Sequence, residues 1–257
     1  MILGGAKPEP PAAPRFYNHN GELAHTIIGS NGKPRAPRVT DIKRHKLVPR
    51  TSTVLEDFSA DSEFFVAKRA IEEFVDVLFD PETGNDPRSI DEADMESMIM
   101  QSVMLSMKAQ SDHAEFGTKF HDAADRDVWG GPVARWEAPY RRFMEEHVAE
   151  TIYSEKTLTC AFWGGTVDRV VRTASGKTAI IDWKTQSFGK SPTFYSKWAL
   201  QMASYEPMLD VPIDEWWSVV VPSREPVSFI LRVWPDPEKW KRLWWNAYNF
   251  WKEKHLG

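Results

Sequence analysis

Two carboxylates and a lysine are the residues whose types and spacing are best suited to chemistry. Asp182 and Lys184 lie two positions apart in residues 178–185, a run that we expect to be a strand with both side chains on one face. Residues 165–172 predict a second strand, and a tight turn between the two would set Asp168 opposite Asp182. Opposed carboxylates repel each other, whereas Mg²⁺ prefers carboxylate ligands, so the hairpin predicts a metal site. Lys184 would then contact a water or a phosphate beside the metal.

Each part of this pattern alone has a simpler interpretation. An Asp-x-Lys sequence occurs in many strands as a surface salt bridge. Gly165 at the strand entry favours the metal-site interpretation, because glycine permits close backbone approach. His121 lies one helical turn after Gly117. A lone helical histidine is more often a core residue, but imidazole is also a common metal ligand.

The elements that must position these residues follow from the periodicity of the sequence. Helical patterns cover residues 51–78, 90–128 and 136–147, and strand patterns cover 151–160, 165–172, 178–185, 216–221 and 227–233. Two more helices are predicted, at residues 191–206, beginning with Ser191 before Pro192, and at residues 236–255. This order predicts an α/β fold, a sheet covered by helices.

Composition and charge divide the chain into three parts. Residues 1–50 contain seven of the eighteen prolines, and residues 33–50 carry seven basic side chains against Asp41 alone, although the net charge of the chain is −5. We expect residues 1–50 to form an extended, basic, partly disordered arm that either contacts a polyanion or is merely solvated. A helical N-terminal region over 51–112 and a core over 113–257 should follow.

The cysteine content and the apolar runs set the expected environment. One cysteine, Cys160, excludes a disulfide framework and a four-cysteine iron–sulfur cluster. No apolar run approaches the ~18 residues of a membrane span, and the proline-rich start does not resemble a secretion signal. We therefore expect a protein of a reducing cytoplasm, without membrane contact.

The order of these residues resembles the RecB-like branch of the PD-(D/E)XK nucleases. That branch has the motifs GTxxH, Glu, GxxD, DxKT and QxxxY, which this chain matches in order over about ninety residues: Gly117 to His121, Glu155, Gly165 to Asp168, Asp182 to Thr185 and Gln201 to Tyr205. Residues 48–55 also loosely resemble a proline–serine–threonine stretch that precedes the first helix in small phage exonucleases and mitochondrial genome-maintenance exonucleases of this branch.

The resemblance implies a three-layer α/β/α restriction-endonuclease-like core with a mixed central sheet, and a metal-dependent DNA exonuclease. Its implied metal ligands are His121, Asp168, Asp182 and the backbone carbonyl of Trp183, with Mg²⁺ as the ion and Mn²⁺ as a substitute. The implied catalytic residues are these three side chains with Lys184, which would orient or deprotonate water, and Glu155, which would support a second metal or the water. The implied DNA contacts are Gln201, Tyr205, Thr118, Thr185 and Arg44.

The implied substrate is DNA with free ends or single-stranded character, in phage or cellular DNA processing, recombination or repair. A single-strand-binding or recombination protein is a further expected partner. The resemblance also implies that the cytoplasm is that of a bacterium or of a phage-infected host. Two other functions remain open. The chain could be an inactive nuclease fold that only binds nucleic acid, or a structure-specific endonuclease of the same fold.

Overall fold

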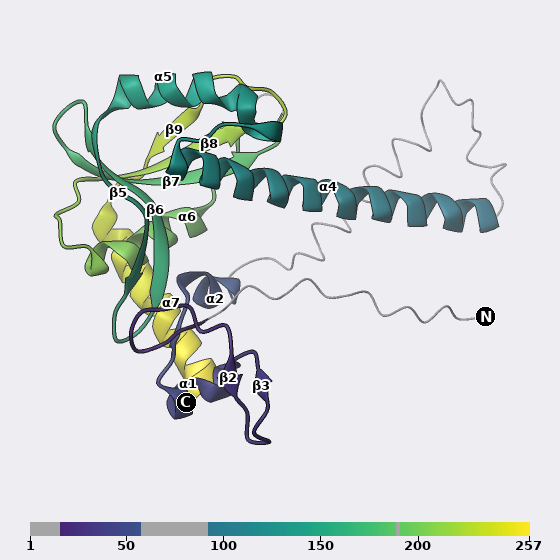
Figure 1. Cartoon of the computed structure of the whole chain (residues 1–257), viewed down its shortest axis with the longest axis vertical. Coiled ribbons are helices and arrows are strands. Elements are labelled where there is room, and N and C mark those ends of the chain that lie inside the picture. Colours follow the sequence, from purple (N-terminus) through teal and green to yellow (C-terminus); the bar gives the residue numbers. More distant parts are fainter. Residues whose placement is uncertain (1–15, 58–91, 189–190) are drawn as a thin grey trace.

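A five-stranded mixed sheet forms the centre of the computed structural model, which describes residues 16–57, 92–188 and 191–257 (Figure 1). The strands lie side by side in the order of the sequence: β5 (Val148–Thr159), β6 (Gly164–Thr173), β7 (Thr178–Gln186), β8 (Glu215–Pro222) and β9 (Ile230–Val233). The β7–β8 pair is parallel and the other three pairs are antiparallel. The predicted strands are therefore present, although β9 begins at Ile230 and not at residue 227.

The hairpin of β6 and β7 has the register that its turn predicts. Arg169 pairs with Ile181 and Arg172 pairs with Thr178, and Gly176 in the turn has a φ of 83° that favours glycine. The pairing ends at Arg169, and the adjacent residue of β6, Asp168, accepts a hydrogen bond from the N–H of Trp183 on β7 at 2.8 Å, which keeps Asp168 close to Asp182.

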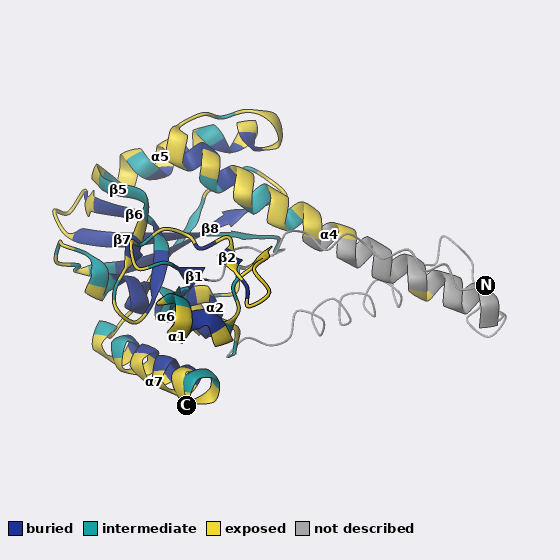
Figure 2. Cartoon of the chain, turned by 60° about the horizontal axis from the view of Figure 1, so that its bottom comes forward, coloured by how far each residue is buried: buried dark blue, intermediate teal, exposed yellow. Residues whose placement is uncertain are grey.

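Helices cover both faces of the sheet. One face of β7, which includes Ile181, is covered by three helices. These are α4 (Glu92–Arg126), the 3-10 helix η2 (Gly131–Trp136) and α5 (Glu137–His147). On the other face, α6 (Ser196–Tyr205) and α7 (Pro237–Leu256) pack against the residues that include Ile180. The inner strands β6, β7 and β8 are mostly buried, whereas the edge strands β5 and β9 and the outer faces of the helices are largely exposed or half-buried (Figure 2). The α/β class is confirmed by this mixed sheet with helical cover.

Helix α6 crosses over from β7 to the parallel strand β8, and it begins at Ser196 and not at Ser191 as predicted. The later start of the helix is explained by the side chain of Gln186. Gln186 donates from Nε2 to the carbonyl of Thr193 at 2.7 Å and accepts from the Thr193 N–H at 3.0 Å, which binds the intervening segment to the end of β7. Helix α6 ends at Tyr205 and continues as the 3-10 helix η3 (Glu206–Met208).

Residues 16–50 do not form the extended arm that the proline content predicted. They form two small antiparallel pairs and two short helical turns: β1 (Phe16–Tyr17) with β4 (Val48–Pro49), β2 (Ile27–Ile28) with β3 (Pro34–Arg35), η1 (Val39–Asp41) and α1 (Ile42–His45). Phe16 is 1% exposed and belongs to the main core. The apolar side chains in this segment bury it against the rest of the chain.

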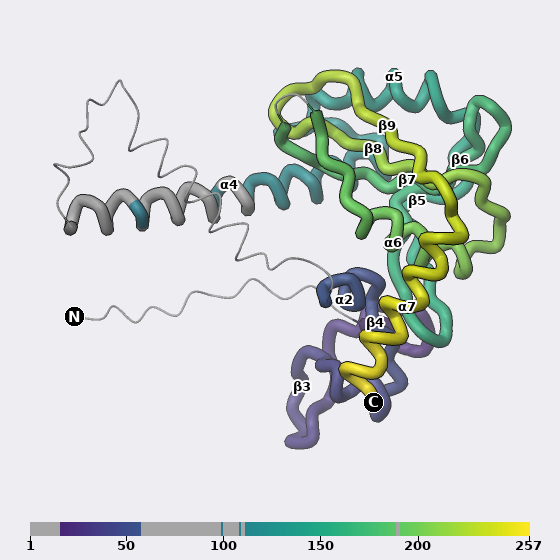
Figure 3. Tube along the Cα trace, turned by 180° about the vertical axis from the view of Figure 1, so that it is seen from behind, coloured from purple at the N-terminus to yellow at the C-terminus, as the bar shows by residue number. Residues whose placement is uncertain are grey.

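The N-terminal elements lie beside the carboxyl-terminal helix. Helix α2 (Thr51–Glu56) contacts both α6 and α7, and Lys43 donates to the carbonyl of Leu256 at 2.7 Å (Figure 3). Residues 58–91, part of the expected helical N-terminal region, lie outside the described residues. The expected boundary at residue 112 falls inside α4, which is continuous to Arg126.

Candidate active site

Helix α4 and strands β5 and β6 bring together three side chains that the sequence placed far apart. The Nδ1 atom of His121 lies 3.4 Å from Oε1 of Glu155 and 3.7 Å from Oδ2 of Asp168. One atom from each of the three residues lies within 4.8 Å of the other two. An imidazole and two carboxylates at this separation could share one metal ion.

Glu155 has an unusual backbone conformation for a strand residue. Its φ is 43°, in the left-handed region that costs a non-glycine residue roughly 1–2 kcal/mol. The residues on either side pair normally with β6, Ser154 with Arg169 and Lys156 with Val167. The distortion is thus confined to the position that brings a carboxylate to His121, and strain of this kind is typical of functional sites.

Asp182 is a buried carboxylate whose one close partner in the described part of the chain is the ammonium of Lys184. It is 1% exposed, its Oδ1 lies 2.7 Å from Nζ of Lys184, and neither of its oxygens accepts a hydrogen bond with satisfactory geometry in the described part of the chain. Burial raises the pKa of Asp182 to about 6, with Asp168 adding to the rise and Lys184 opposing it. Oδ1 is thus paired with the Lys184 ammonium, and Oδ2 remains available to a cation.

Lys184 is held at the site from two sides. Its Nζ contacts Asp182 and donates to Oε1 of Gln201 at 3.1 Å, and Nε2 of Gln201 donates to the hydroxyl of Tyr205 at 2.8 Å. Burial lowers the pKa of Lys184, but the carboxylates of Asp182 and Asp168 outweigh burial, so the net shift is upward. A protonated ammonium is suited to orienting a water or a phosphate, and less to removing a proton.

The same carboxylates act on His121. Burial lowers the pKa of His121, but the nearby carboxylates of Asp168 and Glu155 raise it by more than burial lowers it. The pKa of His121 therefore lies above its ordinary value. A metal ion at this position would compete with a proton for the imidazole, since a ligating histidine must be neutral.

Gly165 makes room for the ring of Tyr205. A Cβ atom at Gly165 would lie 2.4 Å from Cε1 of Tyr205 and 3.2 Å from Oγ1 of Thr51. Thr51 is buried, and its hydroxyl lies 2.9 Å from that of Ser204 and donates to the carbonyl of Gly164 at 3.2 Å. The resemblance of residues 48–55 to a proline–serine–threonine stretch was the signal that could have identified Thr51 as a contact of Gly164 and Ser204 near the site.

Gly117 has the corresponding role on the other side of the site. A Cβ atom there would lie 3.0 Å from Oγ1 of Thr185, so the glycine permits α4 to approach β7 closely. Thr118 is exposed on α4 and donates to the carbonyl of Ala114 at 3.0 Å. Trp183 contributes its backbone N–H, which donates to Oδ2 of Asp168 at 2.8 Å.

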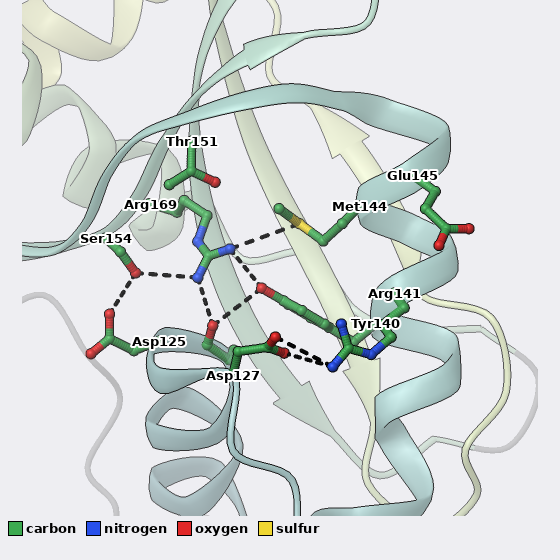
Figure 4. Close-up of a pocket in the computed structure, with 10 residues that line it drawn as sticks. Asp125, Asp127, Tyr140, Arg141, Met144, Glu145, Thr151, Ser154 and Arg169 are labelled. Atoms are coloured by element: carbon green, nitrogen blue, oxygen red, sulfur yellow. Dashed lines mark hydrogen bonds and ion pairs between the residues drawn. The ribbon is translucent and has the colours of Figure 1, made fainter.

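Arg169 is a buried cation that sequence reasoning missed. It is 6% exposed at the edge of a cavity of about 390 Å³, and in the described part of the chain its partners are neutral (Figure 4). It donates to the hydroxyl of Tyr140 at 2.6 Å, to the carbonyl of Ala124 at 2.6 Å and to Oγ of Ser154 at 3.2 Å. Its position directly after Asp168 was the available signal.

These contacts connect the elements that carry the three clustered side chains. Arg169 follows Asp168 on β6, Ser154 precedes Glu155 on β5, and Ala124 follows His121 by three residues on α4. One guanidinium therefore fixes the spacing of all three elements close to the site.

Two of the basic residues of the N-terminal segment, Arg35 and Lys43, have partners away from the site. Arg35 forms two hydrogen bonds with the carboxylate of Asp41, at 2.7 and 2.8 Å, and Lys43 is bound to Leu256. Arg44 is exposed on α1, a helix that lies beside the carboxyl terminus (Figure 1). The structure thus brings together His121, Glu155, Asp168, Asp182, Lys184, Gln201 and Tyr205, with Thr185 adjacent, and leaves Arg44 outside this group.

Comparison with known proteins adds little to this geometry. No family model and no curated protein matches the sequence. The solved structure described as "Crystal structure of SSO0001" aligns over 78% of this chain and 84% of that chain, at 14% identity and a TM-score of 0.31. Within the described residues, no helix has both the length and the apolar character of a membrane span.

Proposed function

We propose that this chain is a metal-dependent deoxyribonuclease with a restriction-endonuclease-like core, of the RecB-like PD-(D/E)XK type, and that it acts as an exonuclease on DNA ends. One observation carries the proposal. The carboxylate of Asp182 is buried with the Lys184 ammonium as its close partner and with Oδ2 unpaired in the described part of the chain, and His121 on α4, Glu155 on β5 and Asp168 on β6 cluster beside it. Buried carboxylates normally have hydrogen-bond partners or bind metals.

The side chains fit a hard divalent cation. Two carboxylates, Asp168 and Asp182, supply oxygen ligands of the kind that Mg²⁺ prefers, and His121 adds a nitrogen ligand that Mn²⁺ accepts readily. We assign Asp168, Asp182, His121 and the backbone carbonyl of Trp183 as the ligands. The bound ion would supply an activated water and would neutralise charge on a phosphodiester.

The remaining residues bind and orient. Lys184, protonated beside Asp182, holds the attacking water or a phosphate oxygen through its Nζ. Gln201 fixes that Nζ, and Tyr205 fixes Gln201, so the QxxxY residues support the lysine from α6. Glu155 holds His121 and is placed to accept a proton from a water near the site.

The sheet topology supports the restriction-endonuclease-like core. A mixed five-stranded sheet with helices on both faces has the layers that this core requires. Asp182 and Lys184 lie on β7, which pairs in parallel with β8.

The test is digestion of oligonucleotides labelled at the 5′ or the 3′ end, single- and double-stranded, with Mg²⁺ or Mn²⁺ and with EDTA as the control. We expect metal-dependent release of short products from linear substrates. Asp168→Asn should abolish release, whereas Asp210→Asn, an exposed carboxylate that accepts from Tyr153, should not. Binding without cleavage would favour the inactive nucleic-acid-binding alternative, and cleavage of a circular single strand would favour an endonuclease.

A further inference from the structure

A chain of aromatic and cationic contacts runs outward from Lys184. Its Nζ lies 6.0 Å from the ring centroid of Trp198, at the beginning of α6. The Trp198 ring makes edge contacts with Tyr195 at 5.3 Å and with Phe194 at 6.0 Å between centroids. Trp198 is buried, whereas Tyr195 is 41% exposed, so the contacts lead from the candidate site to the surface.

Two exposed cations lie over these rings. The guanidinium of Arg232, on β9, is 5.3 Å from the centroid of Phe194 and 4.4 Å from that of Trp234. The ammonium of Lys197 is 5.8 Å from the centroid of Tyr195. In the described part of the chain, neither cation forms a salt bridge with a carboxylate, so both charges remain available to an anionic ligand.

This surface is fixed relative to the candidate catalytic residues. Gln186, two residues after Lys184 on β7, holds the backbone of Thr193 by two hydrogen bonds, and Phe194 and Tyr195 follow directly. Arg232 reaches the same segment from the edge strand. A surface held from two strands does not need to be ordered when a ligand binds, which reduces the entropic cost of association.

We propose that Tyr195, Lys197 and Arg232 form a binding surface for single-stranded DNA that leads the strand to Lys184; this deepens the proposed function and rests on it. An exposed aromatic ring stacks on unpaired bases of any sequence, and unpaired cations contact the backbone phosphates. In a duplex the base faces are already stacked on one another, so the Tyr195 ring selects single strands.

Binding is measured without metal, in EDTA, so that it does not depend on cleavage. The probes are a fluorescein-labelled oligothymidylate of roughly 20 nucleotides and a duplex of equal length, followed by fluorescence anisotropy. Tyr195→Ala should weaken oligothymidylate binding on the order of 10-fold and change duplex binding less than about twofold, and Tyr195→Phe should restore binding. Phe250→Ala, which removes an exposed aromatic from α7, is the matched control and should change neither.

The salt dependence of Kd distinguishes the contribution of charge from that of stacking. Arg232→Gln should reduce the slope of log Kd against log salt by roughly 0.7, the value for one lost phosphate contact on a single strand, whereas Tyr195→Ala should leave the slope unchanged. Melting temperatures of all variants establish that they are folded. Equal losses for the two probes, unchanged affinity in Tyr195→Ala, or no oligothymidylate binding by the unmodified chain would each overturn the proposal. Selective binding without any cleavage would overturn the proposed nuclease activity and leave this surface standing.

Discussion

Metal binding should stabilise the folded chain in a strongly pH-dependent way. A ligand that binds only the folded state adds RT ln(1 + [L]/Kd) to the free energy of unfolding, about 1.4 kcal/mol when the metal concentration is tenfold above Kd. For a chain of this length, 1 kcal/mol corresponds to roughly 2–4 °C in Tm. Saturating Mn²⁺ or Mg²⁺ at pH 8 should therefore raise the Tm by about 3–6 °C.

The pKa of Asp182 sets the pH at which this stabilisation disappears. With a pKa of about 6, roughly nine in ten of these carboxyls are protonated at pH 5, which lowers the metal affinity about tenfold from this group alone. The same metal concentration then adds only about 0.4 kcal/mol, or roughly 1 °C. The raised pKa of His121 acts in the same direction, because an imidazolium cannot ligate.

The metal-free chain should show the opposite trend. The pKa of Asp182 in the folded state lies above the ordinary value of 3.8, so its contribution to stability is fully present below pH 4 and is lost as the pH rises through about 6. The assay is differential scanning fluorimetry of EDTA-stripped protein, with and without metal, from pH 5 to pH 8. A metal-induced shift of equal size at pH 5 and pH 8, or one that survives in Asp168→Asn, would refute the assignment; Asp210→Asn should behave as the unmodified chain.

Four further predictions test the parts of the site separately. Lys184→Ala should lower single-turnover cleavage by roughly 10²–10³-fold, the loss expected for one electrostatic donor, with the metal-induced Tm shift retained, and a near-normal rate would assign this lysine to structure. Asp182→Ala should abolish cleavage but leave most DNA binding, so wild-type cleavage in that variant would contradict the site. Gly165→Ala should cost about 1–3 kcal/mol of stability by overpacking, measured by urea unfolding against Gly130→Ala, whose Cβ would meet no atom within 4 Å. Arg169→Lys should weaken Mn²⁺ binding on the order of 10-fold in a calorimetric titration, whereas unchanged affinity with a lower Tm would show a purely structural role.

The strands and the register of the hairpin could be predicted because they depend on local patterns. Alternation along β7 placed Asp182 and Lys184 on one face, and the short turn at Gly176 left one register open to Asp168. The proximity of the two acids could therefore be predicted without knowledge of the rest of the fold.

The features that were missed depend on side-chain contacts that periodicity and residue type do not reveal. The prolines of residues 16–50 suggested an arm, but Phe16 buries itself in a core built mostly by the second half of the chain. Ser191 has the right type for a helix N-cap, yet the side chain of Gln186 takes the backbone of Thr193 and delays the helix to Ser196. Neither partner is visible in a local pattern.

The buried pair of Asp182 and Lys184 is poorly explained by stability alone. Ion pairs away from water repay their desolvation only when the remaining lone pairs are hydrogen-bonded, and replacing such pairs with apolar residues is often neutral or stabilising. Asp182 has no such hydrogen bonds in the described part of the chain, and Asp168 adds a second negative charge that raises its pKa further. A cation between the two carboxylates would remove both costs at once. The arrangement is thus unfavourable for a purely structural site and favourable for one that binds metal.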